Sequence, residues 1–308
     1  MRVLLLATMV LAWGVAALAE IPPVEDWPRP VGNVELRVAA DLPEETLLDV
    51  GLVLLDPGIP EDSSTHSKLG IVPEIRKAEA QFMSAILRYV LENSQAWGVV
   101  RVLPETLESS ELLLTGTILH SDGLRLALHI QARDALGRAW LDRVYVDETR
   151  EADYPVAEGL DPYLDLYRQI ANDLLAAREA LSEKQLRDLK EIALLRYAGA
   201  LSPEAFGDYL AIDEQGRYSL LRLPARGDPM LERVHRMRNQ EFLFIDTVDE
   251  QYVALYEEMG PTYNLWRQYG REQAIYREEY RERVANRDSR GRRGSFVAMQ
   301  QTYDAYKW

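Results

Sequence analysis

The clearest periodicity in the chain is an alternation of apolar with polar or small residues over 124–133. This spacing predicts a β-strand with one buried face and one exposed face. The segment 111–120 just before it is also strand-like, and residues 121–123 (Ser-Asp-Gly) between the two form a typical turn signal. An Asp-Gly pair between two such runs predicts a β-hairpin.

Further apolar runs predict strands over 47–55, 98–103 and 139–146, and the segment 59–70 after the first of these predicts a polar loop. Two helices are expected with them. Residues 73–91 carry apolar side chains at steps of three and four, and Asp161 followed by proline opens a second helix. We therefore expect an α+β fold over 46–180, a mixed sheet packed by two helices.

The remainder, 181–308, predicts a mainly α-helical domain. Ser182 with Gln185 fits a capping box, and Ser202 and Asp228 each precede a proline that starts a helix. A short hairpin or extended arm is expected near 213–223. Gly260 and Pro261 predict a sharp helix end, because proline lacks the amide hydrogen that a helix interior uses.

The first residues predict an export signal. Met1 and Arg2 precede an apolar run over 3–18, and small residues at 17 and 19 fit a signal peptidase site. We expect cleavage after Ala19 and a periplasmic or secreted protein. The run is too short for a membrane-spanning helix, and no later stretch is long and apolar enough. Residues 20–45, rich in proline, predict an extended lead-in in which Trp27 packs on the rest of the protein.

The strand–turn–strand succession over 112–130, followed by Asp134 to Arg138 and another strand, resembles the amino-terminal domain of TolB and related envelope accessory domains. The match covers about a third of the chain. The β-propeller repeats that follow in TolB are absent, and the helical half has no counterpart there. The whole chain also resembles an uncharacterised group of exported bacterial proteins. The resemblance implies a periplasmic domain that contacts other proteins and supplies no catalytic residues.

Composition narrows the possible activities. The 308 residues include 50 acidic and 35 basic side chains, a formal charge of −15, and no cysteine. The acidic balance argues against nucleic-acid binding, which depends on Lys and Arg at phosphates. Without cysteine there is no disulfide, thiolate metal site, cysteine nucleophile or lipid anchor through a cysteine. The sequence also lacks a phosphate-binding loop, a dinucleotide fingerprint and a nucleophile elbow.

An arginine cluster near the carboxyl end stands out in this acidic chain. Arginine binds phosphate and carboxylate groups through two parallel hydrogen bonds. The cluster therefore predicts either a site for an acidic partner or an anionic surface, or a patch that neutralises the protein's own acidic helices. Its members are Arg281, Arg283, Arg287, Arg290, Arg292 and Arg293.

An aromatic stripe precedes the arginine cluster. Its helical spacing favours helix–helix packing in a coiled-coil-like seam, and stacking on sugar rings is the alternative. Its members are Tyr263, Trp266, Tyr269, Tyr276 and Tyr280.

The four histidines fit no metal motif. His120 and His129 flank the predicted hairpin, where we expect surface or cross-strand packing in which they can face each other. The loop after the first strand carries Asp56, Glu61, Asp62 and His66, whose carboxylates could hold calcium, but the spacing matches no calcium motif and favours a solvated loop. The sequence predicts no catalytic residue, no metal site and no cofactor.

These features favour a non-enzymatic scaffold or adaptor in a bacterial envelope assembly, with an envelope protein as partner. The alternative is a cell-wall glycan-binding or glycan-hydrolysing protein that uses an acidic cleft and the aromatic helix. A third possibility is a subunit that binds a small exported solute in a pocket between the two halves. The sequence does not give the partner, a ligand or the oligomeric state.

Overall fold

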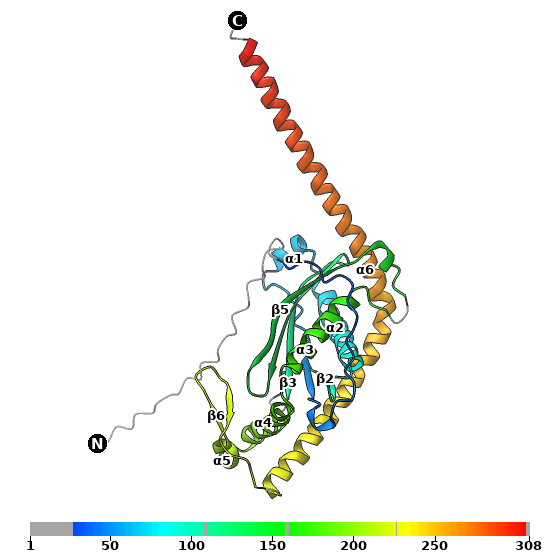
Figure 1. Cartoon of the computed structure of the whole chain (residues 1–308). Helices are drawn as coiled ribbons and strands as arrows, with labels where there is room; N and C mark the ends of the chain where they lie inside the picture. Colours follow the sequence, from blue (N-terminus) through cyan, green and yellow to red (C-terminus); the bar gives the residue numbers. More distant parts are fainter. Residues whose placement is uncertain (1–26, 108–109, 158–159, 226, 306–308) are drawn as a thin grey trace, which may run out of the picture.

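The computed structural model describes residues 27–107, 110–157, 160–225 and 227–305, with only the backbone for Lys68 and for 288–305. The predicted signal peptide, residues 1–19, lies outside the described residues. The centre of the molecule is a mixed five-stranded sheet in the order β2-β1-β3-β4-β5 (Figure 1). This confirms the α+β class. The strands are β1 (Val50–Val53), β2 (Val100–Leu103), β3 (Leu112–Ser121), β4 (Arg125–Asp134) and β5 (Ala139–Glu148).

The sheet combines parallel and antiparallel strands. β1 is parallel to β2 and β3, and each of these pairs is joined through a crossover, whereas β3, β4 and β5 form an antiparallel meander. The predicted hairpin joins β3 to β4, and Gly123 in its turn has φ +85°, a left-handed conformation that glycine adopts without strain. The first strand is shorter than predicted, because the backbone at 47–49 belongs to a connection from the short 3-10 helix η2 (Glu44–Thr46).

Helices α2 (Pro73–Asn93) and α3 (Leu164–Glu179) lie side by side and pack on one face of the sheet. Both were predicted, α2 within two residues of its observed end. Their apolar faces meet the buried face of β3 and β4 in one core, which includes Met83, Leu87, Leu128 and Ile130. At about 2 kcal/mol for each fully buried aliphatic side chain, this core is the main stabilising term.

Helix α4 (Glu183–Leu201) starts at the predicted capping box, in which Ser182 and Gln185 exchange hydrogen bonds. The predicted boundary at 180 falls in the turn before it, and α4 buries Leu186, Leu189 and Ile192 in the same core as the sheet. A short helix, α5 (Pro203–Phe206), and the one-turn 3-10 helix η4 (Gly207–Tyr209) follow. A small hairpin, β6 (Leu210–Ile212) and β7 (Tyr218–Leu220), completes this part, as the sequence suggested.

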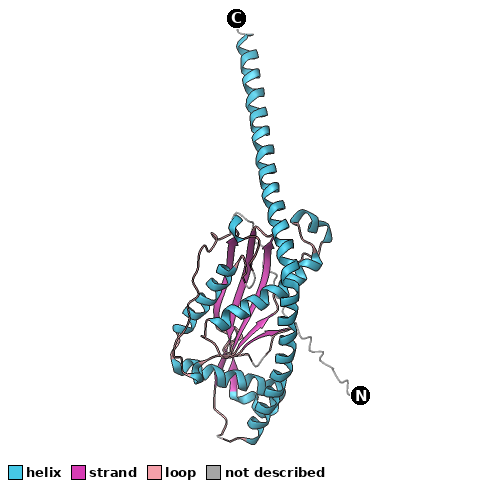
Figure 2. Ribbon diagram, turned by 90° about the vertical axis from the view of Figure 1, so that its right-hand side faces the viewer, coloured by secondary structure: helices cyan, strands magenta, loops and turns pink. Residues whose placement is uncertain are grey.

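The last element is a single long helix, α6 (Pro229–Ala305), which crosses the whole body and projects beyond it (Figure 2). The helix end predicted at Gly260 and Pro261 is therefore wrong. The ring of Phe82 packs against Tyr256 on one side of the proline and Tyr263 on the other, at centroid distances of 4.5 and 4.7 Å. Contacts on both sides hold α6 continuous across a position where proline removes one helical hydrogen bond.

The described part of the lead-in runs along the body in an extended conformation. The amide of Val31 donates a hydrogen bond to the carbonyl of Val146 in β5. The amide of Ala39 donates one to the carbonyl of Ser94, just after α2. Trp27 packs edge-on against His120, with 5.4 Å between the ring centroids.

The segment 59–70 differs from the predicted loop, because it contains the short helix α1 (Ser63–Leu69). Asp62 accepts a hydrogen bond from the amide of Ser64 and so caps the first turn. The 3-10 helix η3 (Glu151–Asp153) is the remaining element. Within the described ranges, no helix combines the length and apolar character that crossing a membrane requires.

Candidate functional site

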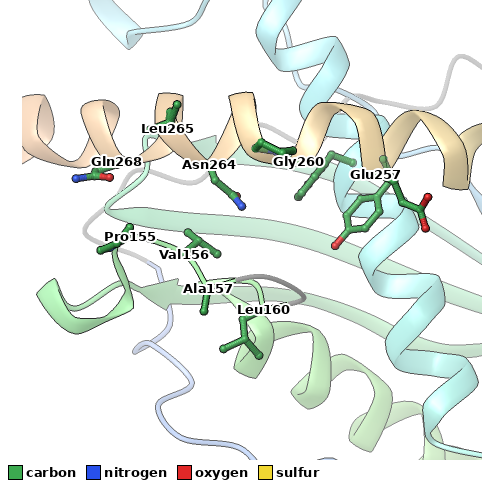
Figure 3. Close-up of a pocket in the computed structure, with 12 residues that line it drawn as sticks. Pro155, Val156, Ala157, Leu160, Glu257, Gly260, Asn264, Leu265 and Gln268 are labelled. Atoms are coloured by element: carbon green, nitrogen blue, oxygen red, sulfur yellow. The ribbon is translucent and has the colours of Figure 1, made fainter.

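A cavity of about 730 Å³ lies where α6 passes over residues 155–157 and 160 (Figure 3). Its floor includes the rings of Phe82 and Tyr256, while Leu160 and Leu265 at its rim remain 57% and 59% exposed. The volume lies in the range of roughly 300–1,000 Å³ that is typical of ligand pockets. The lining is Phe82, Pro155, Val156, Ala157, Leu160, Tyr256, Glu257, Gly260, Pro261, Asn264, Leu265 and Gln268.

Next to this cavity, a buried polar cluster joins α6 to α2 and to the end of β3. Glu79, which is fully buried, accepts hydrogen bonds from the hydroxyls of Ser121 at 2.8 Å and Tyr263 at 3.0 Å. Arg76 places its Nε 2.9 Å from the same carboxylate. Burial raises the pKa of Glu79, and the Arg76 charge opposes this rise. Three elements are therefore tied together at a single carboxylate.

A second buried contact fixes α6 one turn further on. Arg267 is 1% exposed, and its guanidinium lies 2.7 Å from the carboxylate of Asp161, just before α3. The same group lies over the rings of Tyr263 and Phe82, 4.5 and 5.3 Å from their centroids. Burial alone would lower the pKa of Arg267, but the charge and hydrogen bond of Asp161, together with the neighbouring Tyr263 and Tyr154, raise the pKa overall. An ion pair this deep is costly to break, because one charge would stay buried without its partner.

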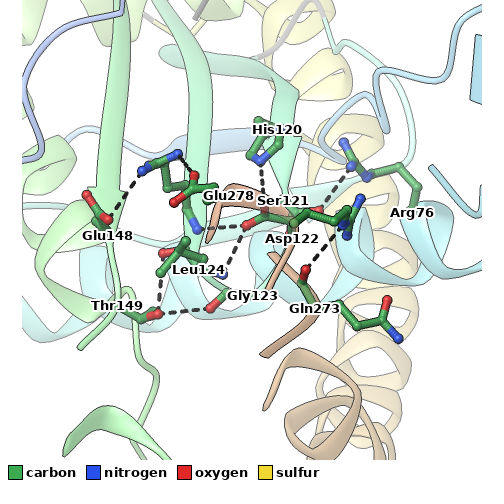
Figure 4. Close-up of polar contacts among 12 residues, drawn as sticks. Arg76, His120, Ser121, Asp122, Gly123, Leu124, Glu148, Thr149, Gln273 and Glu278 are labelled. Atoms are coloured by element: carbon green, nitrogen blue, oxygen red, sulfur yellow. Dashed lines mark hydrogen bonds and ion pairs between the residues drawn. The ribbon is translucent and has the colours of Figure 1, made fainter. Parts of the chain in front are cut away.

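The tip of the β3–β4 hairpin packs directly on the backbone of α6 (Figure 4). A Cβ on Gly123 would lie 2.0 Å from the carbonyl oxygen of Arg267, and one on Gly270 would lie 2.7 Å from that of Asp122. Arg125 then reaches Glu278 on α6 at 2.6 Å. Two glycines therefore permit this close approach, and it marks where α6 leaves the body.

Earlier along α6, charged pairs hold the helix at the edge of the sheet. Arg101 of β2 lies 2.6 Å from Asp246, and Arg88 of α2 lies 2.8 Å from Asp249. The guanidinium of Arg101 also lies 4.3 Å from the ring centroid of Phe242. The edge strand β2 is thus covered by α6, which protects it from pairing with another chain.

Beyond Glu278, α6 continues to Ala305, a length of about 40 Å at 1.5 Å per residue (Figure 1). Tyr269, Tyr276 and Tyr280, with Arg283 and Arg287, are spaced so that they share one face of the helix. All five are exposed, the tyrosines by 65%, 62% and 56%. Arg283 lies over the ring of Tyr276 at 5.8 Å and 3.9 Å from Glu279. We call these five residues the distal face.

The predicted aromatic stripe is thus divided. Tyr263 is buried and Trp266 stacks on it at 6.1 Å, so both pack as the sequence favoured. Helix–helix packing is wrong for Tyr269, Tyr276 and Tyr280, because helical spacing places them on the side of α6 opposite Arg267 and Glu278, which contact the body, and all three rings are exposed.

The arginine cluster is partly described. Arg281, Arg283 and Arg287 are exposed on α6. The side chains of Arg290, Arg292 and Arg293 lie outside the described part, although the helical backbone continues through them.

The histidines do not meet across the hairpin. His120 lies 3.0 Å from Asp122 and His129 lies 2.7 Å from Asp142, so each contacts its own carboxylate. His66 contacts the carbonyl of Pro60, which occupies it within the loop. No group of three or more potential metal ligands occurs among the residues that the structure describes.

Sequence reasoning missed the buried contacts that position α6. Glu79 and Arg267 look like ordinary surface charges in helical segments, and nothing in their spacing marks them. Asp161 was read as a helix cap, and it does accept the amide of Tyr163 at 2.8 Å. A charged residue on the apolar side of a helix, as Glu79 is between Arg76 and Phe82, is the signal that points to such a cluster.

Comparisons of the chain with protein-family models, with curated proteins and with solved structures found no match.

Proposed function

We propose that this protein is an exported, non-enzymatic scaffold or adaptor in a bacterial envelope, and that the distal face of α6 binds a protein partner. The observation that carries the proposal is the distal face itself, whose exposed tyrosines and arginines lie on one side of α6 where the helix leaves the body and continues for about 40 Å beyond Glu278. Tyr and Arg are the residue types most enriched at the energetic centres of protein interfaces.

The way α6 is held supports this role. Glu79, Asp161 and the hairpin tip fix the helix at three neighbouring points, so the direction of its projecting part is set by the body. A rigidly held helix loses little conformational entropy when a partner binds it. The resemblance to envelope accessory domains and the export signal predicted from the sequence are consistent with the same proposal.

The experiment is in-cell crosslinking followed by mass spectrometry, with the native protein and two variants. Tyr276→Ala with Tyr280→Ala removes two aromatic side chains from the distal face, and Tyr89→Ala removes one equally exposed tyrosine (61%) from α2. We expect the distal variant to lose the crosslinked partner and Tyr89→Ala to keep it. Equal partner recovery from all three proteins would contradict the proposal.

Glycan binding is the second candidate, because a shallow hollow on α6 is lined by Tyr269, Tyr276, Glu272, Gln273 and Arg277. Two exposed tyrosines seven residues apart offer stacking faces beside polar groups. Titration with soluble cell-wall oligosaccharides distinguishes the two: saturable binding that Tyr276→Ala abolishes favours the glycan, and its absence leaves the adaptor function.

A further inference from the structure

The cavity between α6 and residues 155–157 and 160 has the properties of a ligand site. It is formed by elements far apart in the sequence: α2 supplies Phe82, α6 supplies Tyr256 and Leu265, and the loop after η3 supplies Val156 (Figure 3). The aromatic floor is made of two rings in contact, 4.5 Å between centroids. Such a floor favours a planar apolar group, because aromatic rings stack well on one another.

The proline inside α6 gives this cavity a hydrogen-bond acceptor. In an unbroken helix the amide of residue 261 would donate to the carbonyl of Glu257. Pro261 has no amide hydrogen, so that carbonyl lacks its helical donor. Glu257, Gly260 and Pro261 all line the cavity, so the freed acceptor belongs to the face of α6 that borders it.

The charge of the lining residues limits which ligands the cavity can accept. Glu257 contributes a carboxylate, and Asn264 and Gln268 contribute side-chain amides. The Asn264 oxygen already accepts from Arg267. Among the described lining residues there is no basic side chain, so an anionic group would find repulsion and no partner.

We propose that this cavity binds a compact aromatic or heteroaromatic molecule, neutral or cationic, that donates an N–H or O–H hydrogen bond to the carbonyl of Glu257. The ring lies against Tyr256, whose ring packs in turn on the buried Phe82, and Leu160 and Leu265 cover its edges. The site does not depend on the adaptor function proposed above, since it uses no residue of the distal face.

Indole and 1-methylindole are a matched pair of probes, because they share a ring system and only indole carries an N–H. Their binding to the purified full-length protein is measured by ligand-observed NMR or calorimetry. We expect saturable binding of indole, and binding of 1-methylindole weaker by about 3- to 10-fold, the value of one net hydrogen bond. Equal affinities, or no saturable binding of indole, would overturn the proposal.

Two variants test the assigned contacts. Pro261→Ala restores the amide that occupies the Glu257 carbonyl and extends the helical hydrogen bonding, so it is expected to fold. In this variant the two probes should bind equally. Ala157→Trp fills the cavity from an exposed position and should abolish binding, whereas Leu221→Trp, exposed elsewhere, should not. Discrimination that survives Pro261→Ala, or binding that survives Ala157→Trp, would contradict the assignment.

A third comparison tests the charge of the ligand. Tryptamine carries a cation on the indole ring, and indole-3-acetate carries an anion. We expect tryptamine to bind more tightly, because the lining offers Glu257 and no described basic side chain. Tighter binding of indole-3-acetate would refute the predicted ligand class.

Discussion

Replacing Arg267 by methionine tests most sharply how α6 is held on the body. Methionine has a similar length and no charge, so the change removes the ion pair while keeping most of the packing. It leaves the carboxylate of Asp161, 9% exposed, without the guanidinium that lies 2.7 Å away in the native protein. It also removes the contact of that guanidinium with the ring of Tyr263.

The magnitude follows from burial. Breaking a buried ion pair by removing one partner costs about 3–5 kcal/mol, because the remaining charge is not solvated. For a protein of this size, that loss corresponds to a fall in Tm of roughly 10 °C. Arg283→Met is the matched control, since Arg283 is 64% exposed and an exposed substitution changes stability by less than about 0.5 kcal/mol.

The assay is urea unfolding followed by tryptophan fluorescence, with a double-mutant cycle. Asp161→Asn removes the second charge but keeps an oxygen that can accept the Tyr163 amide. The double variant should therefore be more stable than Arg267→Met alone by at least about 1 kcal/mol. A loss below about 1 kcal/mol for Arg267→Met, or no recovery in the double variant, would refute this reasoning.

Three further predictions concern the hairpin tip, a buried carboxyl and the distal face. Gly123→Ala should destabilise the protein more than Gly216→Ala: both glycines have positive φ, but only at Gly123 does the new Cβ meet α6, so equal losses in thermal unfolding would contradict the contact. Burial raises the pKa of Glu111 from 4.5 to about 6, so the folded protein binds this proton more tightly than the unfolded chain does. The resulting contribution to the free energy of unfolding is complete below about pH 4.5 and is lost as the pH rises through about 6. Glu111→Gln should therefore gain about 2 kcal/mol relative to the native protein across this window in urea titrations, and a constant difference would count against it. Tyr276→Ala with Tyr280→Ala should leave Tm unchanged within about 2 °C, because both rings are exposed, and a larger fall would show that they pack.

The sheet and its two covering helices were predictable because their signals are local. The alternation over 124–133 and the Asp-Gly turn fix β4 and its hairpin without reference to the rest of the chain. The helical spacing over 73–91 does the same for α2. Element ends were less accurate, as at β1, because tertiary hydrogen bonds decide where a strand begins.

The path of α6 was not predictable, because it depends on contacts between distant residues. Proline at 261 favours a helix end on local grounds, whereas the ring of Phe82, far away in the sequence, contacts the helix on both sides of it. The aromatic stripe shows the same limit. The spacing of Tyr263 and Tyr276 is helical in both cases, but whether each is buried depends on which side of α6 contacts the body.

The central proposal is that the distal face of α6 binds a protein partner. Site-specific photocrosslinking in cells tests it most directly, with a photoreactive amino acid at Tyr280 and, as control, at Tyr89 on α2, where exposure is similar (56% and 61%). We expect a discrete crosslinked protein at position 280 and none at position 89. Crosslinks at position 89 alone, or no crosslink at position 280 with the protein folded and at its native level, would contradict the proposal.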